Sequence, residues 1–241
     1  MKIGEALRAP RLLFPEAALN TDTFELAGIA SALLRHRHDL SEGADRAFVV
    51  VELGAGPGLL GPVLARSCRR VFLTDFADDV LQLCQRNVER NRVQERCRVR
   101  RLDWRQPQRA SSGGHDDFGW QAGELDELST CAVFFAADVI YSDELTDAFV
   151  SQVRELLFQP CAAATRHVFV AVEQRWNFTL PECATTSREY DFFLSCLALD
   201  PAADSSRPGG RLVKGEKIPL DFGRSFPYDR THMHLWRLSA A

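Results

Sequence analysis

A chain of 241 residues, with 46% hydrophobic and 26% charged residues, is long enough to form one well-cored domain. Its formal net charge of −4 argues against a general nucleic-acid-binding protein, which needs a basic surface. The seven cysteines form no C-x-x-C pair, which favours reduced thiols over a disulfide framework or a zinc site. Because no apolar run approaches the length of about 18 residues that a membrane span needs, we expect no membrane association.

The first 46 residues differ from the rest of the chain. Within them, Thr23 suits a helix N-cap, and apolar residues from Leu26 to Leu34 recur at helical spacing. A polar linker, 35–46, follows. We therefore divide the chain into an N-terminal helical or irregular segment, 1–46, and a single larger domain, 47–241.

The domain begins with an apolar run that ends in a glycine-rich turn. Val49, Val50 and Val51 form a continuous apolar stretch, which is typical of a strand covered on both faces in a parallel sheet. Glu52 follows, and then Gly54-Ala55-Gly56-Pro57-Gly58. Glycines permit a tight turn beside a ligand, and a helix that starts there presents free N–H groups. This turn is therefore a candidate site for the polar groups of a nucleotide-like cofactor.

The glycine spacing separates two classes of cofactor. Dinucleotide sites favour G-x-G-x-x-G, but Leu59 stands where the third glycine would fall. An acid two positions before G-x-G-x-G is instead the pattern of S-adenosylmethionine-binding methyltransferases. The next apolar stretch, 70–75, ends in Asp75, and an acid at that distance accepts hydrogen bonds from ribose hydroxyls in both classes.

Strand and helix patterns alternate through the remainder of the domain. Helices are predicted over about 59–68, 80–91, 142–157 and 184–197, with Ser142 as the N-cap of the third. Further strands are predicted over 96–102, 131–137, 167–172, 211–219 and 232–238. The pattern predicts an α/β fold with a doubly wound, mostly parallel sheet of seven strands, the last two at one edge.

A long loop, from about Arg105 to Glu127, separates the third and fourth strands. Its second half is acidic and includes Asp116 and Glu124, so an acidic rim near the active site would attract a cationic substrate such as lysine. The alternative is an insertion without a role. Seven arginines between residues 86 and 101 form either a solvated surface or a contact for an acidic partner.

Several stretches resemble the seven-stranded protein-lysine methyltransferases, a family with a Rossmann-like class I fold. They include Val51 to Leu59, Leu102-Asp103-Trp104, Phe134 to Tyr141 and Asn177 to Leu180. The resemblance implies that the 47–241 domain binds S-adenosylmethionine through Glu52, Gly54, Ala55, Gly56, Asp75, Asp103, Trp104 and Ala137. No metal site is expected, because no third ligand accompanies His232 and His234.

The resemblance also implies that Asp138 and Tyr141 border a channel for the substrate lysine. The expected reaction is methyl transfer to an accessible lysine of a protein substrate, in the nucleus, the cytoplasm or both, without stable nucleic-acid binding. One alternative is an N-methyltransferase acting on a small molecule or nucleic acid. A second is a non-catalytic binding protein, because Phe24-Glu25-Leu26-Ala27 lacks the tryptophan that the family usually carries there. A nicotinamide-dependent dehydrogenase is disfavoured by the glycine spacing.

Overall fold

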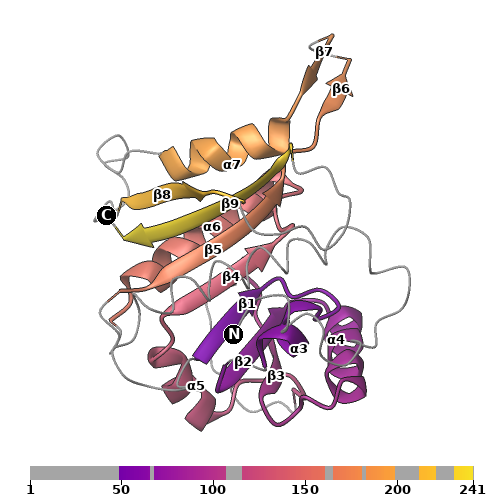
Figure 1. Cartoon of the computed structure of the whole chain (residues 1–241), viewed down its shortest axis with the longest axis vertical. Coiled ribbons are helices and arrows are strands. Elements are labelled where there is room, and N and C mark those ends of the chain that lie inside the picture. The colour runs from indigo at the N-terminus through magenta and orange to yellow at the C-terminus, as the bar shows by residue number, and fades with distance from the viewer. Residues whose placement is uncertain are drawn as a thin grey trace.

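A seven-stranded sheet organises the computed structural model (Figure 1). Its strand order is β3-β2-β1-β4-β5-β9-β8, and β9 runs antiparallel to both of its neighbours. The strands are β1 (Val49–Leu53), β2 (Arg70–Asp75), β3 (Cys97–Arg101), β4 (Val133–Ala137), β5 (His167–Glu173), β8 (Val213–Ile218) and β9 (Met233–Ala240). The structure describes residues 49–65, 68–106, 116–160, 165–180, 183–198, 212–220 and 231–240.

The central strand β1 is buried along its whole length, because both faces of the sheet are covered. Val49 and Val51 belong to a core cluster formed with α6 (Asp143–Phe158) and α7 (Arg188–Ala198). Val50 points to the opposite face, where α3 (Leu60–Leu64) and α4 (Asp78–Arg90) pack. The mostly parallel, doubly wound fold predicted from the sequence is confirmed.

Helix boundaries follow local chemistry. Ser142 caps α6 as predicted, since its Oγ accepts a hydrogen bond from the Leu145 N–H at 3.3 Å. α4 ends at Arg90 with Asn91 as its C-cap, also close to the prediction. None of the helices in the described ranges has both the length and the apolar character to cross a membrane.

The predicted loop from Arg105 to Glu127 is wrong at its end, where α5 (Ala122–Ser129) begins. The Glu124 carboxylate accepts a hydrogen bond from the Gln121 N–H at 3.1 Å and closes the first turn of this helix. The remaining part of the loop, 107–115, lies outside the described residues, as do the predicted helix at 23–34 and the whole of 1–48.

Acidic residues of the 105–127 stretch form ion pairs with arginines of β2 and β3. Glu124 receives two hydrogen bonds of 2.5 Å from the Arg100 guanidinium, a buried bidentate pair between α5 and β3. Asp116 pairs with Arg101 at 3.0 Å, and Glu127 with Arg70 at 3.2 Å. These three acids therefore pair with arginines of β2 and β3, and attraction of a cationic substrate by the loop stays a prediction.

A second, two-stranded sheet was missed in the sequence. β6 (Asn177–Thr179) and β7 (Ala184–Thr186) form an antiparallel hairpin between β5 and α7. The helix predicted over 184–197 is wrong at its start, because β7 occupies its first residues and α7 begins at Arg188. Figure 1 shows the hairpin projecting above α7, away from the main sheet.

Candidate active site

A cavity of about 410 Å³ lies at the carboxyl ends of β1, β2 and β4, where a doubly wound sheet places its ligands. Nine of the ten predicted site residues line it: Glu52, Gly54, Ala55, Gly56, Asp75, Trp104, Ala137, Asp138 and Tyr141. The sequence missed Pro57, Leu59, Phe76, Ala77, Val80, Leu102 and Val139, which complete the lining. Most of them lie within two positions of a predicted residue, so the strand ends would have been the signal for them, whereas Val80 lies on α4.

The glycine turn forms the floor of the cavity in a conformation that other residues rarely adopt. Gly56 has φ +53°, and a Cβ built on it meets no atom within 4 Å. The turn is tied to β2, because the Ala55 N–H donates to the Thr74 carbonyl at 2.8 Å and the Gly56 N–H donates to Asp75 Oδ2 at 3.1 Å. The backbone at Gly56 therefore faces open space that a ligand can approach closely.

Asp75 occupies the end of β2 at the wall of the cavity. Its Oδ1 accepts a hydrogen bond from the Phe76 N–H at 2.8 Å, and its Oδ2 accepts the one from Gly56. A carboxylate offers about four acceptor positions, so these bonds orient the group and leave capacity for further donors. The geometry suits the recognition of hydroxyl groups.

Two buried polar atoms at the cavity have no hydrogen-bond partner within the described part of the chain. They are Glu52 Oε2 and Trp104 Nε1. Burial, and next the nearby Asp75, raises the pKa of Glu52 well above its usual value. The Trp104 ring packs on Phe149 with 5.2 Å between ring centroids. Because buried polar groups are normally paired, these atoms point to a polar ligand as the missing partner.

Asp138 and Tyr141 lie at the opposite wall, just beyond β4. Asp138 adopts φ +53°, and both of its carboxylate oxygens accept hydrogen bonds of 2.7 Å from Arg175 Nη2. The Tyr141 side chain is 54% exposed, and its pKa is raised by burial and by the charges of Asp75 and Asp138. Its phenol group therefore keeps its proton at neutral pH.

Arg175 is a residue of this site that the sequence did not reveal. It follows β5 by two positions, and its partner Asp138 lies 37 residues earlier in the chain. Burial lowers the pKa of the Arg175 guanidinium, but the charge and hydrogen bonds of Asp138 outweigh this and raise it. The only sequence signal is that a residue just beyond β5 must lie near the end of the neighbouring β4.

Asp103 is the predicted cofactor residue that does not line the cavity. Its carboxylate accepts hydrogen bonds from Arg105 Nε at 2.9 Å and Arg105 Nη2 at 3.0 Å. The Arg105 guanidinium in turn lies over the Phe76 ring, 4.7 Å from the centroid. A contact between Asp103 and a cofactor stays a prediction.

This chain is similar in sequence and in fold to known methyltransferases. Methyltransferase-like protein 22 is 34% identical in Homo sapiens and 33% in Mus musculus, over 85% and 84% of this chain. The chain spans about half the length of these relatives, 50% and 51%. The methyltransferase domain of bacterial CtHen1 shares the fold, with a TM-score of 0.53 and 15% identity, covering 91% of this chain and 98% of that one. A family model described as lysine methyltransferase matches residues 26–195, and the chain therefore belongs to the lysine methyltransferase family.

Proposed function

We propose that this chain transfers a methyl group from S-adenosylmethionine to the side-chain amine of a lysine in a protein substrate. The observation that carries the proposal is the cavity itself. In a chain of this family, one cavity joins the glycine turn, the Asp75 carboxylate and the Asp138–Tyr141 wall.

The residues present fit this cofactor. When bound, S-adenosylmethionine supplies an electrophilic methyl group on a sulfonium centre. Asp75 would hold the ribose hydroxyls, and Gly56 would admit the cofactor close to the backbone. Glu52 Oε2, buried and without a partner among the described residues, suits a polar group of this molecule. Trp104 and Ala137 would complete the wall around it.

Asp138 and Tyr141 are proposed to orient the lysine. A lysine amine has a reference pKa of about 10.4 and must be neutral to attack, and desolvation at the cavity lowers that pKa. Asp138, fixed by Arg175, would accept a hydrogen bond from the amine, and the Tyr141 phenol would narrow the approach. The cofactor would supply the methyl group, its carbon–sulfur bond breaking to release S-adenosylhomocysteine as the new carbon–nitrogen bond forms, and the methylated amine would lose its proton to solvent. Because Arg175 occupies both oxygens of Asp138, positioning describes this residue better than strong general-base catalysis.

The test uses tritiated S-adenosylmethionine and nuclease-treated cell extract as the acceptor. We expect the wild-type chain to place label on protein, recovered as methyllysine after acid hydrolysis. Asp138→Asn and Tyr141→Phe should each slow labelling, whereas Asp126→Asn, an exposed change on α5, should not. Full turnover by both site variants, with cofactor binding retained, would contradict the assigned roles.

The same experiment separates the alternatives. Label that appears only in small molecules or, without nuclease, in nucleic acid would support a different acceptor. Val139 and Ile140, which follow Asp138, are aliphatic, so neither offers an aromatic face for stacking a flipped base. A folded chain that binds cofactor but labels nothing would support the non-catalytic reading.

A further inference from the structure

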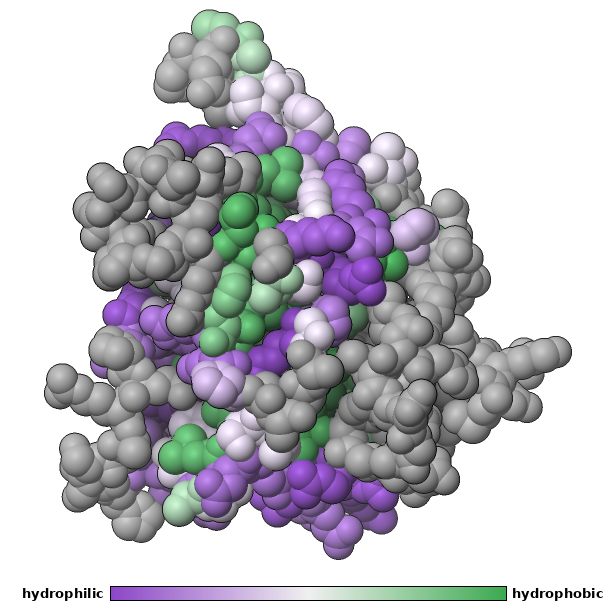
Figure 2. Space-filling model, turned by 90° about the vertical axis from the view of Figure 1, so that its left-hand side faces the viewer, coloured by the Kyte–Doolittle hydropathy of each residue, from purple (hydrophilic) through white to green (hydrophobic). Residues whose placement is uncertain are grey.

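The β6–β7 hairpin, whose base adjoins the proposed active site, exposes apolar side chains. Trp176 is 49% exposed, Phe178 64% and Leu180 80%, so exposure increases toward the tip. They alternate along the first leg of the hairpin, a period that directs side chains to one side of an extended chain. In Figure 2 the described part of the hairpin stands at the top in white to pale colours, unlike the purple hydrophilic surface below it.

The hairpin does not gain its stability from the main sheet. Its two strands pair only with each other among the described residues, through Asn177 with Thr186, Phe178 with Thr185 and Thr179 with Ala184. An isolated two-stranded hairpin is marginal in water, and exposed aromatic residues add no stability to it unless they are covered. This arrangement indicates a surface that functions by meeting a partner.

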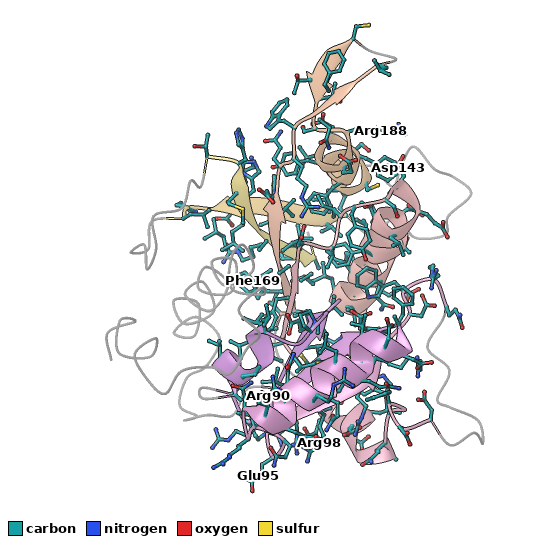
Figure 3. The ribbon with its side chains drawn as sticks, turned by 90° about the vertical axis from the view of Figure 1, so that its right-hand side faces the viewer. Arg90, Glu95, Arg98, Asp143, Phe169 and Arg188 are labelled. Atoms are coloured by element: carbon teal, nitrogen blue, oxygen red, sulfur yellow. The ribbon has the colours of Figure 1, made fainter. Side chains whose placement is uncertain are left out.

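The base of the hairpin is nevertheless held by ion pairs, one of them to a residue that lines the cavity. Arg175, at the start of the first leg, binds Asp138. Arg188, at the end of the second leg, binds Asp143 at 3.0 Å, and Figure 3 shows these two side chains lying together at the start of α7 and α6. Asp138 and Asp143 are the two ends of the short segment that contains Tyr141. Both legs of the hairpin are therefore anchored to the segment proposed to orient the lysine.

Two further contacts hold the base. Gln174 Nε2 donates a hydrogen bond to the buried Ser187 Oγ at 2.8 Å, joining the two legs directly. Trp176 Nε1 donates to His232 Nδ1 at 3.2 Å, which ties the first leg to the residue preceding β9. The anchored base sets the position of the hairpin. The apolar tip is exposed and can contact a partner.

We propose that the hairpin is the docking arm for the polypeptide segment that carries the target lysine. This inference rests on the proposed function. A lysine that enters between Asp138 and Tyr141 brings its flanking residues past a hairpin anchored to that same segment. Apolar residues flanking the lysine pack on Phe178 and Leu180, so the preferred substrate segment contains a lysine next to hydrophobic residues rather than a purely basic run.

The test compares Phe178→Ser/Leu180→Ser with Leu212→Ser, a matched change of an exposed apolar residue near β8 that is 50% exposed. Each chain is titrated with S-adenosylhomocysteine and then assayed with tritiated S-adenosylmethionine over a dilution series of nuclease-treated extract. We expect unchanged cofactor affinity and plateau rate for the double variant, with the half-saturating extract concentration raised about tenfold. Leu212→Ser should match the wild type in cofactor affinity, plateau rate and half-saturating extract concentration.

The outcomes separate the two proposals. If the wild-type chain binds cofactor but labels no protein, the proposed function fails. If the wild type labels protein and the double variant has the same half-saturating extract concentration as Leu212→Ser, only the docking role of the hairpin fails. A drop in plateau rate without a change in half-saturation would also overturn it, because the hairpin would then support the reaction centre.

A second measurement addresses the identity of the occupant. A benzoylphenylalanine photo-crosslinker placed at position 180 should attach to the same protein that receives the methyl label. Co-sedimentation of the wild type, but not of the double variant, with phosphatidylserine–phosphatidylcholine vesicles would instead assign the hairpin to a lipid surface and overturn the proposal.

Discussion

Replacement of Gly58 by alanine should destabilise the protein through two separable effects. Gly58 has φ +77°, and a Cβ built there lies 2.5 Å from Cys84 Sγ, on the buried face of α4. The left-handed backbone costs about 1–2 kcal/mol for a non-glycine residue, and overpacking costs about 1–3 kcal/mol more. We therefore expect Gly58→Ala to lower the free energy of unfolding by about 2–5 kcal/mol.

The two effects can be measured with a double-mutant cycle. Cys84→Ala removes the Sγ atom, which leaves the Cys84 Cβ at 3.5 Å from the new methyl group, an ordinary contact. In that background Gly58→Ala should cost only the backbone strain, so urea denaturation should give a coupling energy of about 1–3 kcal/mol. Additive effects, with a coupling energy below about 0.5 kcal/mol, would refute the reasoning.

Three further predictions concern charged groups at the site. Arg175→Lys should lower kcat about tenfold, because hydrogen bonds to a charged group contribute about 1.5–3 kcal/mol. The affinity of this variant for S-adenosylhomocysteine should stay within about threefold of the wild type. An unchanged kcat would show that Arg175 has no role at the site. Because the pKa of Glu52 is raised above the reference value of 4.5, the folded state keeps a proton that the unfolded state has lost, and stability falls as pH rises between these two pKa values. Glu52→Gln should abolish this part of the pH dependence, so its melting temperature should decline less than that of the wild type between about pH 5 and pH 8, whereas parallel curves would contradict the raised pKa. Asp103→Asn should weaken S-adenosylhomocysteine binding by less than about threefold, since Arg105 holds this carboxylate outside the cavity; a loss as large as that of an Asp75 variant would restore Asp103 to the cofactor site.

Much of the site follows from local sequence because parallel strands bring their carboxyl ends together. Glu52, Asp75 and Ala137 each lie at or next to the end of a buried strand, so a correct reading of three strands is enough to assemble them. The apolar runs at 49–51 and 133–136 made those strands recognisable. The sheet order does not follow from chain order alone, because β4 pairs with β1 instead of β3, and β9 lies between β5 and β8.

The missed features depend on partners that are distant in the sequence. Glu124 lies in the first turn of α5 and its carboxylate binds Arg100, 24 residues away, so the acidic stretch resembled a loop until its partner was known. The hairpin strands are three residues each and lack an apolar core, and Trp176 and Phe178 there gave no buried-strand pattern. Arg175 could not be assigned because its role depends on the turn that places it at Asp138.

The central claim is that the cavity beside the glycine turn binds S-adenosylmethionine through Asp75. The most direct measurement is isothermal titration of the wild-type chain with S-adenosylhomocysteine, together with Asp75→Ala and the exposed control Asp126→Ala. We predict a dissociation constant on the order of 1 μM for the wild type and the control, weakened at least about tenfold in Asp75→Ala. No binding by a folded wild-type chain, or equal binding by all three, would contradict the account.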